Sequence, residues 1–153
     1  MFKKIFLFIL CLAPWFLNLL FKIDYSYYDL IKLPVFAPPQ KFYMIAWSIV
    51  YIGIAISIYK IVFDYKLKDI PNSYKIVLLI NYLLNQSYTL VFFNLKSNFL
   101  GFVICLLIFI TTIVLYKETK NLKESSSKFL GPYLLLSLFG TILSLSIYLI
   151  NFF

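Results

Sequence analysis

The side chains with the clearest capacity for chemistry are amide and aromatic groups that lie inside apolar runs. Four of them follow one another at intervals of four, three and four residues, which places them on one stripe of a helix: Asn81, Asn85, Tyr88 and Phe92. An amide within hydrocarbon is costly unless it finds a partner, so this stripe is expected to face the interior of a helical bundle. There it would either join helices by hydrogen bonds or orient a ligand, and the sequence favours neither role.

A second aromatic group surrounds three prolines in residues 27–51, which read YYDLIKLPVFAPPQKFYMIAWSIVY. Each proline lacks a backbone donor and holds the preceding residue extended, so a helix is expected only after Pro39. The segment therefore predicts a stiff cap over the end of a bundle. The candidate ligand contacts in it are Phe36, Pro39, Tyr43, Trp47 and Tyr51. For Phe36 and Tyr43, anchoring at a membrane interface or packing of the cap is the favoured interpretation.

Other kinds of chemistry have little support in this sequence. The chain has no histidine, so it lacks the commonest general base, metal ligand and axial ligand of haem. Cys11 and Cys105 lie in separate apolar runs, far from the spacing of metal ligands. We therefore predict no catalytic residue, no metal site and no cofactor.

The composition is that of a membrane protein. Of the 153 residues, 63% are hydrophobic and 13% are charged, and the mean hydropathy is +0.92. A water-soluble domain could not bury that much apolar surface in one core. All 14 cationic residues are lysines that cluster between apolar runs, so the net charge of +8 indicates contact with lipid head groups rather than nucleic acid.

Five apolar runs predict an all-α bundle of transmembrane helices forming a single domain over residues 1–153. The expected helices cover about residues 5–21, 42–63, 74–93, 99–116 and 129–152. The first run could also be a cleaved signal peptide, but its length and the lack of an Ala-x-Ala site favour a helix, which Pro14 should kink. The fourth run is interpreted mostly as lipid-facing scaffold. In the fifth, the small residues Ser137, Gly140 and Ser144 predict close approach of another helix.

The distribution of lysines predicts the orientation in the membrane. Ten lysines belong to the N-terminus and to the second and fourth connections, whereas four belong to the first and third connections. Because cytoplasmic segments carry the excess of positive charge, the N-terminus is expected in the cytoplasm and the first loop outside. A bacterial cell membrane is the expected location.

Three stretches of the sequence resemble the TspO/MBR family, the tryptophan-rich sensory proteins and translocator or peripheral benzodiazepine receptors. They are Tyr28, Pro34, Phe36, Pro38-Pro39, Tyr43, Trp47 and Tyr51; then Leu84-Asn85, Tyr88 and Phe92-Phe93; then Pro132-Tyr133 through Leu143 to Asn151. The resemblance implies five membrane helices, often dimeric, and a receptor or sensor for a flat hydrophobic ligand. Protoporphyrin-type tetrapyrroles are the leading ligand class that it implies, with sterols as another.

The resemblance also implies which residues would form the pocket. Trp47 stands where the family has a tryptophan lining the porphyrin pocket, and Leu136 and Phe139 of the last helix complete the expected ligand contacts. Leu136 replaces a family tryptophan, so the light- and oxygen-dependent porphyrin degradation described for some bacterial members is expected to be weak or absent. Two further roles stay open: a carrier of tetrapyrrole- or sterol-like ligands, and a scaffold without a ligand. The spans contain no acidic residue, which argues against a proton-coupled carrier.

Overall fold

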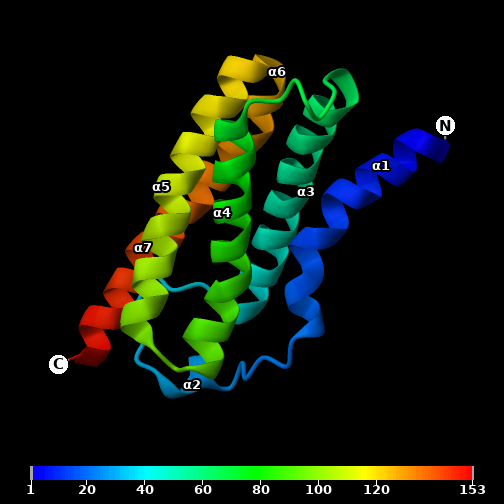
Figure 1. Ribbon diagram of the computed structural model, residues 1–153. Helices are drawn as coiled ribbons and strands as arrows, with labels where there is room; N and C mark the ends of the chain where they lie inside the picture. Colours follow the sequence, from blue (N-terminus) through cyan, green and yellow to red (C-terminus); the bar gives the residue numbers. More distant parts are fainter. Residues whose placement is uncertain (1, 153) are drawn as a thin grey trace.

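The protein is a bundle of long helices that stand side by side (Figure 1). The structure is a computed structural model that describes residues 2–152, so the predicted domain limits, residues 1 and 153, lie outside it. Within this range there is no strand, and five helical segments are long and apolar enough to cross a membrane. They are Phe2–Leu20, Gln40–Asp64, Asn72–Asn94, Asn98–Leu122 and Glu124–Phe152. The predicted fold class is thereby confirmed.

The first span changes its form at Pro14, as the sequence predicts. It consists of α1 (Phe2–Leu12) and the 3-10 helix η1 (Ala13–Leu20). Proline has no N–H to continue the α-helical pattern, and it is tolerated in the first turn of the new segment. Figure 1 shows α1 inclined to the other helices, and it packs against α3 (Gln40–Asp64), where the Phe8 ring lies edge-on to that of Tyr59. The buried Trp15 of η1 packs against the rings of Tyr51 and Tyr82.

The first loop contains the short helix α2 (Tyr27–Leu30) and then runs to Pro39 without further helix, through a turn at residues 34–37 in which the Ala37 N–H donates to the Pro34 carbonyl at 2.9 Å. Helix α3 (Gln40–Asp64) begins directly after that proline, whose backbone angles are φ −58° and ψ 147°. The expected start at residue 42 is therefore two residues late, because Gln40 and Lys41 join the helix as soon as the last proline is passed.

The third span is α4 (Asn72–Thr89), whose last turn widens into the π-helical segment η2 (Leu90–Asn94). A tight turn with Lys96 at φ 51° leads to α5 (Asn98–Leu122). The chain continues through α6 (Glu124–Ser127) and η3 (Lys128–Leu130) into α7 (Gly131–Phe152). Helix α5 extends six residues beyond the expected end at residue 116, because charge ends a membrane span but Lys and Glu are good helix formers.

The interpretation of the fourth run as mostly lipid-facing scaffold misses the buried side of this helix. Helix α5 packs against both α4 and α7, as Figure 1 also shows. Its buried residues recur at intervals of four and three: Gly101, Cys105, Ile108, Thr112, Leu115 and Thr119. This is the spacing of a helix seam between two neighbours, made largely of small residues. High overall hydropathy concealed it, because the lipid-facing side is equally apolar.

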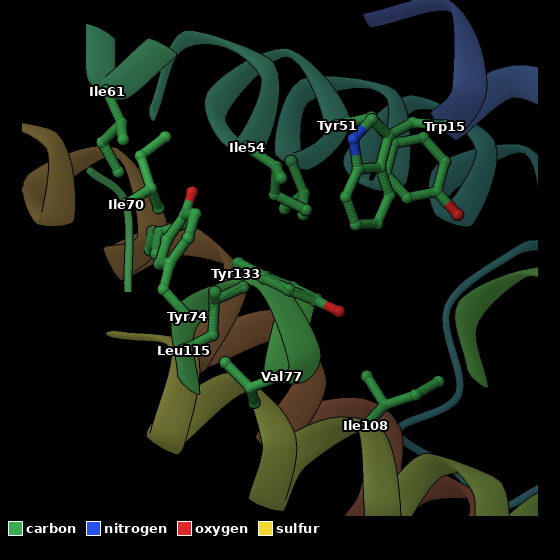
Figure 2. Packing of buried hydrophobic residues seen from close by; sticks show 12 residues of the cluster. Trp15, Tyr51, Ile54, Ile61, Ile70, Tyr74, Val77, Ile108, Leu115 and Tyr133 are labelled. Atoms are coloured by element: carbon green, nitrogen blue, oxygen red, sulfur yellow. The ribbon is translucent and has the colours of Figure 1, made fainter. Parts of the chain in front are cut away.

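The core fills the space between α3, α4, α5 and α7. Figure 2 shows Ile54 and Ile61 of α3 on one side of it, with Tyr133 of α7 and Tyr74 of α4 opposite them. Tyr133 and Ile54 are fully buried. The large side chains leave the capped end of the bundle less completely filled, and the cavity lies there.

Candidate ligand-binding cavity

A cavity of about 340 Å³ lies between the first loop, η1, α3, α4, α5 and α7. Tyr25 and Tyr28 of the first loop contribute to its lining, so the loop closes one end of it. Leu19 and Met44 also line the cavity and are exposed on the outside, which places its opening between η1 and the first turns of α3. No charged residue lines it within the described part of the chain.

Six of the eleven residues predicted as ligand contacts line this cavity: Tyr43, Trp47, Tyr51, Asn85, Tyr88 and Phe92. They come from α3, α4 and η2, which the structure brings together around one cavity. Spacing along each helix therefore identified the inward faces of the second and third spans.

Five predicted contacts do not line the cavity. Pro39 precedes the first turn of α3, and Phe36 is half exposed, with its ring edge-on to that of Phe139 at a centroid distance of 6.4 Å. Phe139 packs against the cluster formed by the cap and η2, and Leu136 packs against the main core. Asn81 lies deeper in the bundle than the cavity floor.

Asn81 joins three helices by hydrogen bonds. It is fully buried, and its Nδ2 donates to the hydroxyls of Thr111 and Thr112 on α5 at 2.9 and 3.1 Å. The Tyr133 hydroxyl of α7 donates to its Oδ1 at 2.8 Å. Both ends of the amide are thus satisfied by protein groups, which is the interhelical role that its sequence position left open. Asn85, one turn further along α4, donates to the same Tyr133 hydroxyl.

Aromatic rings form most of the polarisable surface of the cavity. The Trp47 ring lies 5.8 Å from that of Tyr51 and 6.1 Å from that of Tyr133, centroid to centroid. On α4 and η2, Tyr88 and Phe92 stack nearly parallel at 5.6 Å and 10°. Aromatic rings from α3, α4 and η2 thus line one cavity, and such a lining suits a flat apolar molecule that can contact their faces.

The first loop is attached to the end of the bundle by polar contacts. The Tyr27 hydroxyl donates to Asn98 Oδ1 at 2.9 Å and to the Lys96 carbonyl at 3.1 Å, and burial raises the pKa of Tyr27. Asp24 pairs with Lys96 at 3.3 Å. Hydrogen bonding from Ser26, together with Lys96, lowers the pKa of Asp24. The Asp24 carboxylate is therefore charged at neutral pH, and this contact is lost only when the pH falls through that lowered value.

Sequence reasoning missed the contributions of η1, α5 and α7. The residues concerned include Phe16, Asn18, Cys105, Ile108, Ser137, Gly140, Leu143 and Ser144. The small residues of α7 were expected to allow close approach of another helix, and the Ser144 hydroxyl does lie 3.3 Å from Cys105 Sγ of α5. At Gly140, however, an added Cβ would meet nothing within 4 Å. At this position the missing side chain leaves open space in the cavity rather than a helix contact. The spacing of small residues at intervals of four and three could have identified the sides of α5 and α7 that face the bundle interior.

Comparison with known proteins agrees with this architecture. A family model described as "TspO/MBR family" matches residues 6–149, from the first long helix to the last. The chain is 37% identical over 134 residues to the tryptophan-rich protein TspO of Bacillus cereus, covering 88% of this chain and 86% of that protein. It is 34% identical over 132 residues to the uncharacterized membrane protein YtaB of Bacillus subtilis, covering 86% and 84%.

Proposed function

The chain belongs to the TspO/MBR family, and on that premise we propose that it is a receptor or sensor for a flat hydrophobic molecule, with a protoporphyrin-type tetrapyrrole as the expected ligand. Family membership and five spanning helices support a membrane protein with a sensory, receptor or transport role. The ligand itself is our proposal. The observation that carries it is the capped cavity lined by the Trp47–Tyr51 and Tyr88–Phe92 ring pairs.

The size of the cavity limits how such a ligand would sit. Ligand cavities in proteins commonly measure about 300–1,000 Å³, and this one, at about 340 Å³, lies at the lower end. A tetrapyrrole would therefore insert part of its ring among the aromatic side chains of the lining and extend through the opening beside Leu19 and Met44. Its carboxylates would remain outside, because the described lining carries no cation to pair with them.

Titration of the purified protein with protoporphyrin tests this proposal. Saturable changes in the Soret band and in tryptophan fluorescence are expected. Trp47→Ala should weaken binding about tenfold, because it removes one aromatic wall, whereas Trp47→Phe should keep most of the affinity. Trp15→Phe is the matched control, since Trp15 is buried outside the cavity lining. A Soret band that does not saturate, or an affinity unaltered by Trp47→Ala, would reject the site.

Degradation of the ligand by light and oxygen is the alternative activity. Trp47 is placed to meet a bound ring, but Leu136 lacks an indole and packs in the core away from the cavity lining. We therefore expect the spectrum of bound protoporphyrin to stay constant under illumination. Steady bleaching that requires Trp47 would establish the enzyme instead.

Transport, dimerisation and orientation are further proposals for this protein. Movement of protoporphyrin into liposomes that contain the protein would establish a carrier. A homodimer, which the family resemblance implies, is tested by the mass of the protein in detergent. The N-terminus is expected on the cytoplasmic side, because cytoplasmic segments carry the excess of lysines.

A further inference from the structure

A chain of hydrogen bonds behind the cavity begins with two hydroxyl groups on α5. The Thr112 hydroxyl donates to the Ile108 carbonyl at 2.7 Å, and the Thr111 hydroxyl donates to the Leu107 carbonyl at 2.7 Å. A hydroxyl has one hydrogen to donate. Both threonines can therefore only accept a hydrogen bond from a third group, and Asn81 supplies it.

Those two acceptors determine which way the Asn81 amide points. Its Nδ2 must face Thr111 and Thr112, at 2.9 and 3.1 Å. Its Oδ1 then faces the opposite side, where it accepts from the Tyr133 hydroxyl at 2.8 Å. The single hydrogen of the Tyr133 hydroxyl is donated to Asn81. Toward any further group, this hydroxyl can therefore only accept a hydrogen bond.

The next group is Asn85, which lines the cavity. Its Nδ2 donates to the Tyr133 hydroxyl and to the Asn81 backbone carbonyl, the latter at 2.9 Å. These two bonds use both hydrogens of the amide. The Asn85 Oδ1 is left without a partner among residues 2–152, and it is the atom that remains for the cavity.

We propose that the hydrogen-bond chain Thr111/Thr112–Asn81–Tyr133–Asn85 holds Asn85 as an acceptor, so that the preferred ligand carries an N–H or O–H donor on the part that reaches the cavity floor. This inference rests on the proposed function and names the ligand chemistry of the same cavity. Asn81 and Tyr133 are positioning residues, since neither lines the cavity.

Two neighbouring serines have the same polarity. Ser137 and Ser48 both line the cavity, and their hydroxyls donate to carbonyls of their own helices, at 3.1 Å to Leu134 and 2.7 Å to Met44. Each therefore presents an oxygen acceptor to a ligand. The Thr89 hydroxyl has no hydrogen-bond partner among the described residues, so it can donate to a ligand or accept from one.

A pair of flat molecules that differ at one atom tests the proposal. Carbazole carries an N–H where dibenzofuran carries an oxygen, and the two have nearly the same shape. Affinities are measured by equilibrium dialysis against the full-length protein in nanodiscs, with protein-free nanodiscs correcting for partition into lipid. Carbazole should bind about tenfold more tightly, because dibenzofuran sets an acceptor against the acceptor of Asn85.

Variants then show whether the preference comes from this chain of hydrogen bonds. Asn85→Leu should bring the two affinities close together. The double variant Thr111→Val with Thr112→Val should reduce the preference without touching the cavity, because Asn81 is no longer held in one orientation. Asn72→Ala, which removes an exposed asparagine at the start of the same helix, should keep it. Circular dichroism and gel filtration show whether each variant folds. If Asn85→Leu does not fold, the double threonine variant serves as the test.

The outcomes separate this inference from the proposed function. If both molecules bind saturably with equal affinity, the donor requirement is wrong and the hydrophobic-ligand cavity stands. If Asn85→Leu still binds carbazole more tightly than dibenzofuran, the assignment of the preference to Asn85 is also wrong. If neither molecule binds saturably and protoporphyrin does not bind either, both the proposed function and the inference fail.

Discussion

Phe92 is the side chain that joins the cap to the cavity wall. It is 1% exposed, stacks on Tyr88 and meets the ring of Tyr27 edge-on at 5.7 Å. Its ring lies against Gly101 of α5, where an added Cβ would approach the ring to 2.7 Å. Since Phe92 is enclosed by other aromatic rings, it cannot move aside freely, and the absence of a side chain at Gly101 sets its position.

Gly101→Ala should therefore destabilise the protein and weaken ligand binding. The helix gains about 1 kcal/mol of propensity, but overpacking against an enclosed ring costs about 1–3 kcal/mol. A lower thermal unfolding midpoint in detergent, followed by circular dichroism, and a weaker protoporphyrin affinity are expected. Gly131→Ala is the control, because a Cβ there meets nothing within 4 Å. Equal midpoints for the two variants would show that Phe92 is free to adjust.

Asn81 and Asn85 show how far residue spacing can predict a site. Spacing on α4 placed both on one inward stripe, and both are buried. It could not separate the residue that lines the cavity from the one that holds helices together. That difference depends on depth along the helix and on Thr111 and Thr112 of α5, which lie thirty residues away and had been assigned to a lipid-facing run.

At the scale of elements, two asparagines hold the start and the middle of the first loop. Asn94 accepts from the Asp24 N–H at 3.0 Å and donates to the Lys22 carbonyl at 2.9 Å. Asn151 accepts from the Lys32 N–H at 2.9 Å and donates to the Lys32 carbonyl at 2.8 Å. Each amide thus satisfies two backbone groups that secondary structure leaves unpaired. The prolines stiffen the loop, and the asparagines attach it to η2 and α7.

Asn151→Ala should loosen the loop while leaving the bundle intact. Two hydrogen bonds to Lys32 are lost, each contributing about 1 kcal/mol, so amide exchange near Lys32 should accelerate about tenfold or more. Hydrogen exchange with mass spectrometry measures this directly. Ser146→Ala serves as the control, because that hydroxyl bonds only within α7. Unchanged exchange in the loop would mean that the prolines alone hold it.

Helix α3 lies very close to the backbone of η3, the segment that precedes α7. A Cβ on Gly53 would meet the backbone carbonyl oxygen of Phe129, in η3, at 2.8 Å. A backbone carbonyl cannot move aside as a side chain can. The connection before α7 therefore depends on glycine at this position.

Gly53→Ala should accordingly separate α3 from η3 and lower stability by about 1–3 kcal/mol, an overpacking cost that the gain in helix propensity offsets only in part. The comparison with Gly131→Ala in thermal unfolding again isolates the steric effect. An unfolding midpoint at or above that of the unmodified protein would contradict the close approach.

The element boundaries were predictable only where one residue type dictates them. Pro14 and Pro39 place the change from α1 to η1 and the start of α3, because a missing N–H acts locally. The π-helical end of α4, the continuation of α5 to Leu122 and the helical form of residues 124–127 depend on packing between segments. Local sequence carries little information about such contacts. Hydropathy indicates which residues lie within the bilayer, but it does not show where a helix ends.

At the scale of the whole molecule, apolar side chains cover the outside of the bundle while lysines gather at its ends. Exposed large hydrophobic residues occur on all five long segments. The first loop lies at one end, joined through Lys96 to the turn after η2, and α6 lies at the opposite end (Figure 1). The ten and four lysines counted from the sequence thus belong to opposite ends of the bundle.

This charge difference predicts that the end carrying the first loop faces away from the cytoplasm. Single cysteines at Lys32 and Lys68 test it, in a background where Cys11 is serine and Cys105 is alanine. A maleimide that cannot cross membranes should label Lys32→Cys in intact bacteria, and Lys68→Cys only after the cells are permeabilised. Labelling of both in detergent shows that each thiol can react. The reverse pattern in intact cells would place the cavity and its cap on the cytoplasmic side, where a ligand would arrive from within the cell.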